Sequence, residues 1–194
     1  SSSALILAGM ALSAVCGAFS SFIVYFANNK EGMQTIAYWM MGSLAGAQWG
    51  ELAVIAPIIM ASILFFWTQS RVLNLMLLGD ESAITMGTDL HAYRQWYLLI
   101  SSLIVGFAVY SAGMIGFVGL IVPHVIRMFT GPDHKRLLPV AALVGAIFLD
   151  VADGLCRVII PHTELPIGIL ISMIGAPSFI YLMIKKTYGF GGSD

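Results

Sequence analysis

Charged residues are scarce in this sequence, and motifs for nucleotide binding or covalent catalysis are missing. Only 10% of the 194 residues are charged, whereas an average soluble domain has roughly 25%. The formal net charge of −1 gives no indication of nucleic-acid binding. The sequence has no G-x-x-x-x-G-K-[ST] phosphate-binding loop and no nucleophile motif. We therefore do not expect this chain to bind ATP through such a loop or to be an enzyme.

Cysteine is also rare, and the histidines do not form a metal-binding pattern. Cys16 and Cys156 both lie in hydrophobic stretches, which favours small buried side chains over a disulfide. The four histidines are scattered along the chain: His91, His124, His134 and His162. Because they lack the spacing of metal ligands, we expect neither a metal site nor another cofactor.

Hydrophobic residues, by contrast, make up 59% of the chain, and the mean hydropathy is +0.90. These values are typical of an integral membrane protein surrounded by lipid. Four stretches are long and apolar enough to cross a membrane as single helices. They are residues 4–27, 52–68, 137–156 and 165–184. We expect an all-α, multi-pass fold.

A fifth uncharged stretch, residues 95–126, has an awkward length. As one helix it would extend about 48 Å at about 1.5 Å per residue, whereas a hydrocarbon core is about 30 Å thick. It is also short for two full crossings. Gly113, Gly116 and Gly119 lie in its middle and would permit a turn between two helices.

The distribution of Lys and Arg favours the two-helix interpretation. With one crossing, three basic residues lie on one side of the membrane and six on the other. With a hairpin, seven share one side and only Lys30 and Arg157 face the other. The sequence therefore predicts six transmembrane helices, with both chain ends and the segment "GPDHKR" (131–136) in the cytoplasm.

Small residues recur at helical spacing. In the first span they are four apart, at Gly9, Ser13, Gly17 and Ser21. Such a face lets another helix approach closely. We expect helix packing rather than a pore lining. "MGSLAGAQWG" repeats the spacing with Gly42, Gly46 and Gly50, and we also expect helix packing from Gly119, Pro123 and His124.

Two segments outside the spans are expected to be helical. The apolar segment between Glu31 and Glu51 is too short to span and is predicted to lie at the outer interface, with Tyr38 and Trp39 at headgroup level. Residues 70–94 read as two short cytoplasmic helices. Gly79 would end the first, Asp80 would cap the second and Gly87 would end it. Their apolar face needs cover, either from this chain or from a partner; it comprises Val72, Leu73, Met76 and Leu77.

Two carboxylates interrupt the predicted span 137–156. Intramembrane carboxylates indicate an ion or substrate path by default, which keeps an ion-coupled secondary transporter open as an alternative. Asp153 lies four residues before Arg157, so the two side chains can pair on one helix face. We favour this local pairing for Asp153, whereas Asp150 has no such explanation.

Long motifs in this sequence resemble the FecCD-type permeases of binding-protein-dependent ABC importers, which take up ferric siderophores, haem and vitamin B12. They are "GFVGLIVPHVIR", "GPDHKRLLP", "ADGLCR" and "ELPIGILISMIGAPSFIYLMIKK". "LILAGMALSAVCGAF", "YWMMGSLAG" and "LLGDESAITMG" match the same family in the same order.

The resemblance implies a single permease domain over residues 1–194, corresponding to the fifth to tenth helices of a ten-helix subunit whose preceding spans are absent. It implies a homodimer in the inner membrane, with two ATPase subunits in the cytoplasm. A periplasmic or lipoprotein substrate-binding protein would dock outside, at Arg157. The loop 70–94 would contact the ATPase, and we expect six residues to carry that contact: Leu78, Gly79, Asp80, Glu81, Ala83 and Gly87.

The transport mechanism implied by the resemblance is alternating access driven by the separate ATPase. A ferric siderophore is the first expectation for the cargo, with haem or vitamin B12 as alternatives within the same family. Two other classes stay open: the ion-coupled transporter and a membrane scaffold that uses its small-residue faces only for assembly.

Overall fold

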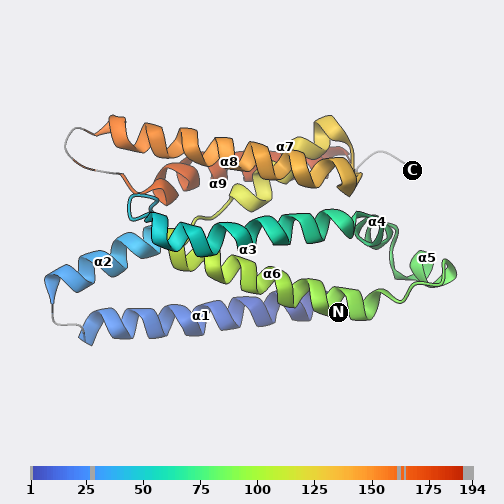
Figure 1. Cartoon of the computed structure of the whole chain (residues 1–194), viewed down its shortest axis with the longest axis horizontal. Coiled ribbons are helices and arrows are strands. Elements are labelled where there is room, and N and C mark those ends of the chain that lie inside the picture. The colour runs from blue at the N-terminus through green and yellow to red at the C-terminus, as the bar shows by residue number, and fades with distance from the viewer. Residues whose placement is uncertain (1, 27–28, 161–162, 164, 190–194) are drawn as a thin grey trace. The chain divides into compact units, whose positions relative to one another are not determined.

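The computed structural model describes residues 2–26, 29–160, 163 and 165–189, and the regular structure within these residues is helical (Figure 1). The chain divides into two units, Ser1–Met40 and Met41–Asp194, which are described separately. The helices are α1 (Ser2–Phe26), α2 (Lys30–Met41), α3 (Trp49–Thr68), α4 (Ser70–Leu78), α5 (Asp80–Thr85), α6 (Leu90–Ala112), α7 (Val118–Thr130), α8 (His134–Ile159) and α9 (Ile167–Gly189).

The first unit contains one long and one short helix. The hydrophobic α1 is long enough to cross a membrane, and Gly9, Ser13, Gly17 and Ser21 all lie on it, as expected. At the start of α2, the side chain of Asn29 accepts a hydrogen bond from the Glu31 N–H. The helix expected in the segment between Glu31 and Glu51 is confirmed over Lys30–Met41, and the chain then leaves the helix before α3 begins at Trp49. The location of α2 at the membrane surface stays a prediction.

The expected second face of small residues is wrong. Gly42 has a φ of +76° and ends α2, so Gly42, Gly46 and Gly50 do not share one helix. The Ser43 N–H instead donates to the carbonyl oxygen of Ala112 at 2.9 Å. A Cβ on Gly42 would meet Cγ1 of Ile115 at 2.9 Å. This glycine therefore permits a close approach of two backbone segments.

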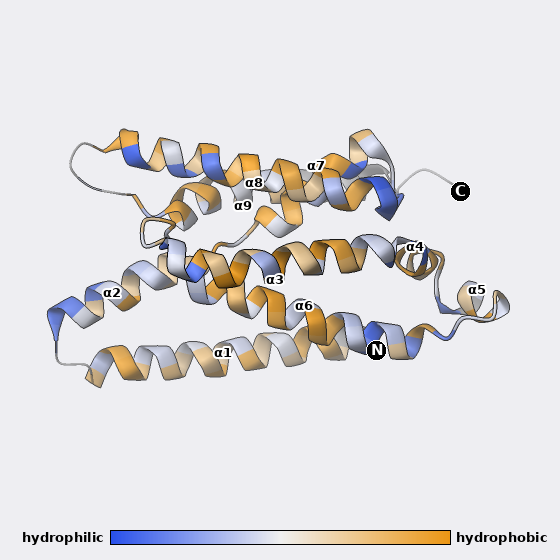
Figure 2. Ribbon diagram, viewed as in Figure 1, coloured by the Kyte–Doolittle hydropathy of each residue, from blue (hydrophilic) through white to orange (hydrophobic). Residues whose placement is uncertain are grey.

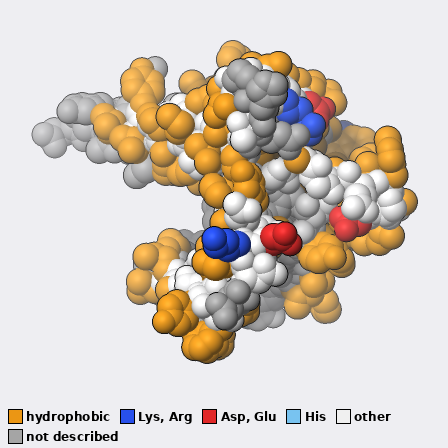
Figure 3. Space-filling model, turned by 90° about the vertical axis from the view of Figure 1, so that its left-hand side faces the viewer, with side chains coloured by type: hydrophobic (Ala, Val, Ile, Leu, Met, Phe, Trp, Pro, Cys, Tyr) orange, Lys and Arg blue, Asp and Glu red, His pale blue; other side chains and the backbone are white. Residues whose placement is uncertain are grey.

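The second unit contains three further helices long and apolar enough to cross a membrane: α3, α6 and α8. Within the described residues, α1 brings the total of such helices to 4, and shorter apolar helices cover Val118–Thr130 and Ile167–Tyr181. Figure 2 shows hydrophobic residues along the middle of α3, and hydrophilic residues on α8 mainly towards its two ends. In the end-on view, most visible side chains on the flanks are hydrophobic (Figure 3). This pattern suits helices surrounded by lipid.

The stretch 95–126 does form two helices, α6 and α7, as the charge count predicts. Gly113 ends α6 with a φ of +73°, and Phe117 precedes α7 with a φ of +63°. Gly119 lies inside α7 rather than in the turn. With 13 residues, α7 extends only about 20 Å.

The buried core of this unit lies where α8 packs against its neighbours. Ala152, Cys156, Ile167 and Ile171 form one cluster between α8 and α9. Val122, Ile126 and Leu137 form a second cluster between α7 and α8. Cys156 is thus a small core residue, as expected, whereas Cys16 is exposed on α1; both thiols are free.

Candidate functional site

Residues 70–87 form two short helices at one end of the second unit (Figure 1). Gly79 ends α4 with a φ of +90°, and Gly87 follows α5 with a φ of +78° and donates its N–H to the Ile84 carbonyl. These positive φ values favour glycine. The two-helix prediction is confirmed. We call this region, together with the start of α6, the end of α7 and the start of α8, the α4–α5 end.

Asp80 does not cap α5, contrary to the sequence prediction. Gly79 occupies the N-cap position, and no side chain caps this helix. The Asp80 carboxylate instead pairs with Arg94 on α6: Oδ1 lies 2.7 Å from Nη2, and Oδ2 lies 3.4 Å from Nη1. The Arg94 guanidinium lowers the pKa of Asp80, chiefly through this hydrogen bond. Asp80 therefore stays ionised at neutral pH and ties α5 to α6.

Replacing Arg94 with glutamine should loosen α5 without affecting membrane insertion. Since both side chains are about half exposed, the effect on global stability should be small. Amide hydrogen exchange of residues 80–85 should accelerate. Without the ion pair, less free energy is needed to open α5 locally. Arg71→Gln is the matched control on α4, and the exchanged pair Asp80→Arg with Arg94→Asp should restore slow exchange. Unchanged exchange in Arg94→Gln would contradict this role.

The α4–α5 end presents a surface of exposed hydrophobic side chains. Leu77 and Leu78 of α4 are 48% and 58% exposed, and Ile84 and Met86 are 66% and 62% exposed. We call these four residues the apolar end surface. Ala83 lies between them in sequence but is fully buried within the chain. An exposed apolar surface outside the spanning segments is typical of a protein interface.

A groove of about 510 Å³ lies beside this surface, between α4 and the loop joining α7 to α8. Its lining comes from Arg71, Asn74, Leu75, Leu77, Leu78, Thr130, Pro132 and Asp133. The lining combines leucines with charged and amide groups, and Asn74 and Asp133 are bonded to each other within it.

Of the six residues expected to contact an ATPase, five are described with their side chains. Leu78 and Gly87 are exposed, as are Gly79 and Asp80, whereas Ala83 faces the interior of this chain. The side chain of Glu81 lies outside the described residues. The contact itself stays a prediction. Ile84 and Met86, absent from the expected set, are more exposed than Leu78. That Ala83 is buried while Ile84 and Met86 are exposed depends on the orientation of α5, which the sequence does not reveal.

At the opposite end of α8, Asp153 and Arg157 form the expected ion pair. Nε of Arg157 lies 2.8 Å from Oδ2 of Asp153, and the side chains are 48% and 21% exposed, respectively. Asp150, one turn earlier, is exposed. The ion pair holds Arg157 on its own helix but leaves about half of its side chain accessible, which suits a docking role without establishing one.

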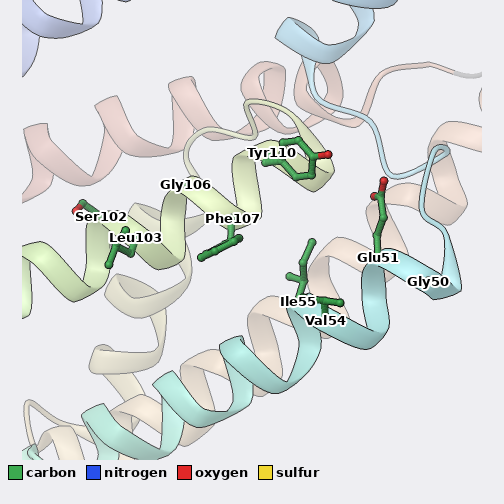
Figure 4. A pocket seen from close by; sticks show the side chains of 9 residues that line it. All are labelled: Gly50, Glu51, Val54, Ile55, Ser102, Leu103, Gly106, Phe107 and Tyr110. Atoms are coloured by element: carbon green, nitrogen blue, oxygen red, sulfur yellow. The ribbon is translucent and has the colours of Figure 1, made fainter.

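The second unit also contains a hydrophobic groove between α3 and α6, of about 670 Å³. Figure 4 shows Val54 and Ile55 on α3, with Leu103 and Phe107 on α6. Glu51 and Tyr110 mark the end of the groove farthest from α4–α5. This groove cannot be predicted from sequence periodicity, since its residues belong to two separate spans.

The residues expected to pack helices together also have defined positions. Pro123 lies inside α7, and His124 is partly buried beside it, whereas Gly119 is exposed. Their packing role stays a prediction. Among the residues that the structure describes, no three His, Cys, Asp or Glu side chains gather in a way that could hold a metal ion.

Comparison with known families identifies this helical arrangement. The model of the FecCD transport family matches residues 1–185. The chain belongs to the FecCD transport family. It is therefore a member of a transport family and a multi-pass protein of the bacterial inner membrane. This FecCD chain is 41% identical to the hemin transport system permease protein HmuU of Yersinia pestis, over 94% of its own length and 54% of the relative's.

Other relatives of the FecCD chain are named for a different cargo. It is 40% identical to the cobalamin import system permease protein BtuC of Halobacterium salinarum, covering 92% of this chain and 47% of that protein. It is 38% identical to the vitamin B12 import system permease protein BtuC of Citrobacter koseri, covering 96% and 56%. The chain thus spans about half the length of these curated relatives.

A solved structure has the same fold. It is described as an inward-facing conformation of a metal-chelate type ABC transporter. The TM-score is 0.86 at 35% identity, and the match covers 93% of this chain and 58% of the other. The membership of the FecCD family suggested by the motifs is therefore confirmed by both sequence and structure.

Proposed function

We propose that this chain is the membrane-crossing part of an ABC importer that carries a metal chelate into the cell. The observation that carries the proposal is the FecCD family match over residues 1–185, supported by the TM-score of 0.86 to a metal-chelate type ABC transporter. The chain contributes no covalent chemistry. It forms a path that opens alternately to the two sides of the membrane.

The proposed cargo is an iron chelate. A ferric siderophore is ranked first because iron chelates are the most common cargo of the family that the motifs resemble, whereas the relatives are named for haemin and cobalamin transport. These cargoes share a bulky organic ligand that encloses a metal ion. A cargo path for such molecules needs width and apolar walls rather than a dedicated metal site. Haem and cobalamin stay as the alternatives.

The proposed assembly has two copies of the permease, two ATPase subunits and one binding protein. The ATPases contact the apolar end surface in the cytoplasm, and the binding protein docks outside, near Arg157. When the two ATPase subunits close on ATP, they favour one of two permease states. This requires that the ATPases make different contacts with the two states. Six helices, α1, α3, α6, α7, α8 and α9, cross or enter the membrane in this arrangement. The Asp153–Arg157 ion pair weighs against a proton relay through Asp153.

The sidedness of α8 can be measured by cysteine labelling in membrane vesicles. After Cys16→Ala, a cysteine at position 136 should react only with a reagent added to the cytoplasmic side. A cysteine at position 158, near the other end of α8, should react only from outside. The reason is that seven of the nine Lys and Arg residues then lie in the cytoplasm. Reaction of both positions from the same side would contradict this orientation.

The cargo is tested with the full-length permease, its ATPase and its binding protein reconstituted in liposomes. Uptake of a ferric siderophore, haemin and cyanocobalamin would be compared at equal concentrations. We expect ATP-dependent accumulation of the ferric siderophore, reduced by an excess of the same unlabelled siderophore. Accumulation of haemin or cyanocobalamin alone would contradict the siderophore assignment while leaving the importer assignment intact.

A further inference from the structure

The side chain of Asn74, in the middle of α4, makes three hydrogen bonds to residues that follow it by about 60 positions. Its Nδ2 donates to Oδ1 of Asp133 at 2.8 Å. Its Oδ1 accepts from the His134 backbone N–H at 2.9 Å and lies 2.8 Å from Nδ1 of the same histidine. All three residues are partly buried. An amide used on both its donor and its acceptor side has one favourable orientation.

These hydrogen bonds hold the beginning of α8. Asp133 is the N-cap of this helix and accepts from the Lys135 N–H at 3.0 Å, while His134 is its first residue. Since Oδ1 of Asn74 can only accept, Nδ1 of His134 carries a proton in this arrangement. The Asn74 and Lys135 hydrogen bonds lower the pKa of Asp133, so its carboxylate is ionised at neutral pH.

A second polar contact joins α3 to the same turn of α8. Nε1 of Trp67, near the end of α3, donates to the carbonyl oxygen of Lys135 at 3.0 Å. The first turn of α8 is therefore held from α3 by an indole and from α4 by an amide. Leucine contacts alone would let α4 slide along α8, because apolar packing is not directional. Hydrogen bonds depend on distance and angle, so they fix the register of α4 against α8.

The position of α8 makes this register significant. Its 26 residues extend about 39 Å at about 1.5 Å per residue, and Arg157 lies in its last turn. One helix therefore connects the α4–α5 end with the opposite end of the unit. Movement of α4 passes directly into α8, and so towards Arg157, if the junction between α4 and α8 does not slip.

We propose that Asn74 is a positioning residue for transport: its hydrogen bonds to Asp133 and His134 make α4 and α8 move as one unit when the ATPase moves α4. This inference rests on the proposed function. Asn74 need not touch the ATPase or the cargo. Its role is to carry the displacement of α4 into α8, and through α8 to the outer end.

The hydrogen-bonding roles give a specific pattern of variants. Asn74→Asp places two carboxylates opposite each other and removes the donor, so the junction should open. In Asp133→Asn, the new amide oxygen still accepts from Asn74 and Lys135, so the junction should survive. The exchanged pair Asn74→Asp with Asp133→Asn restores a donor opposite an acceptor between these two positions. It gives up the hydrogen bond from the Lys135 N–H, because Oδ1 of Asp133 accepts both bonds. If Asn74 mattered only for the volume of its side chain, this exchange would not restore the junction.

The test uses the full-length permease in complex with its ATPase, in lipid nanodiscs. Cys16→Ala removes the exposed native thiol, and a spin label at position 158 reports the distance between the outer ends of α8 in the two copies. In the otherwise unchanged complex, ATP with vanadate should shift this distance. Asn74→Asp should reduce the shift to less than half while ATPase co-purification is retained. Asp133→Asn should show the full shift, and the exchanged pair should recover part of it.

The possible failures are distinguishable. A full shift in Asn74→Asp, or no recovery in the exchanged pair, would overturn the role of Asn74 while leaving the importer assignment intact. If the permease with native Asn74 neither binds the ATPase nor responds to ATP, the proposed function fails, and the role of Asn74 fails with it. Loss of ATPase binding in Asn74→Asp alone would also overturn the proposal, because it would make Asn74 part of the docking surface.

Discussion

Ile84→Asp is expected to abolish stable association with the ATPase while leaving membrane insertion intact. Ile84 is 66% exposed on α5, so the change removes no buried contact within this chain. In the complex, however, it would place an unpaired carboxylate in an apolar interface. Loss of a central hydrophobic contact costs about 2 kcal/mol or more, or roughly 30-fold in affinity. Co-purification and calorimetric titration of the detergent-solubilised complex would measure it.

The matched control is Val158→Asp. Val158 is 75% exposed and lies near the opposite end of α8, so it introduces the same charge away from the proposed ATPase surface. This variant should bind the ATPase normally. If Ile84→Asp also binds normally, α5 is not part of the ATPase contact. If both variants lose binding, the added charge acts through folding or insertion rather than through the interface.

Arg157→Glu is expected to slow association with the substrate-binding protein. Family resemblance directs this arginine towards acidic groups on that protein, and reversing its charge replaces attraction with repulsion. At low ionic strength the association rate should fall by about tenfold or more, because charge complementarity acts mainly on the encounter rate. The difference from the unaltered protein should shrink as salt is added. Stopped-flow binding at several salt concentrations would measure both effects.

Loss of the Asp153–Arg157 pair complicates this variant, so a second one is needed. Asp153→Arg combined with Arg157→Glu keeps an ion pair four residues apart on α8 and reverses its direction. Thermal stability should then recover, whereas the association rate should stay low. Recovery of both quantities would show that Arg157 serves only its own helix. A normal association rate in the single variant Arg157→Glu would also contradict docking at this position.

Several features of the fold were accessible from the sequence because they depend on local composition or on a count over the whole chain. The α6–α7 hairpin follows from the Lys and Arg distribution, which restricts which loops share a side. The ends of α4 and α5 follow from glycine, which adopts positive φ with little strain. The Asp153–Arg157 pair follows from four-residue spacing on one helix.

Other features depend on contacts between segments distant in the chain. The local sequence predicts that Asp80 caps α5. Its carboxylate instead accepts a hydrogen bond from Arg94, 14 residues later. Asn74 meets Asp133 across 59 residues, and no periodicity or motif relates these positions. The spacing of Gly42, Gly46 and Gly50 suggested a helix face, yet the positive φ of Gly42 ends the helix. Spacing alone does not distinguish a packing glycine from one that ends a helix.

The central claim, that this chain belongs to an ATP-driven importer, is tested most directly by the energy source of uptake. The full-length permease, ATPase and binding protein would be reconstituted in liposomes with labelled haemin or ferric siderophore and the binding protein outside, and ATP enclosed. The account predicts accumulation that requires ATP, stops with vanadate and is unaffected when an ionophore removes the proton gradient. Uptake that persists without ATP and disappears with the ionophore would contradict it.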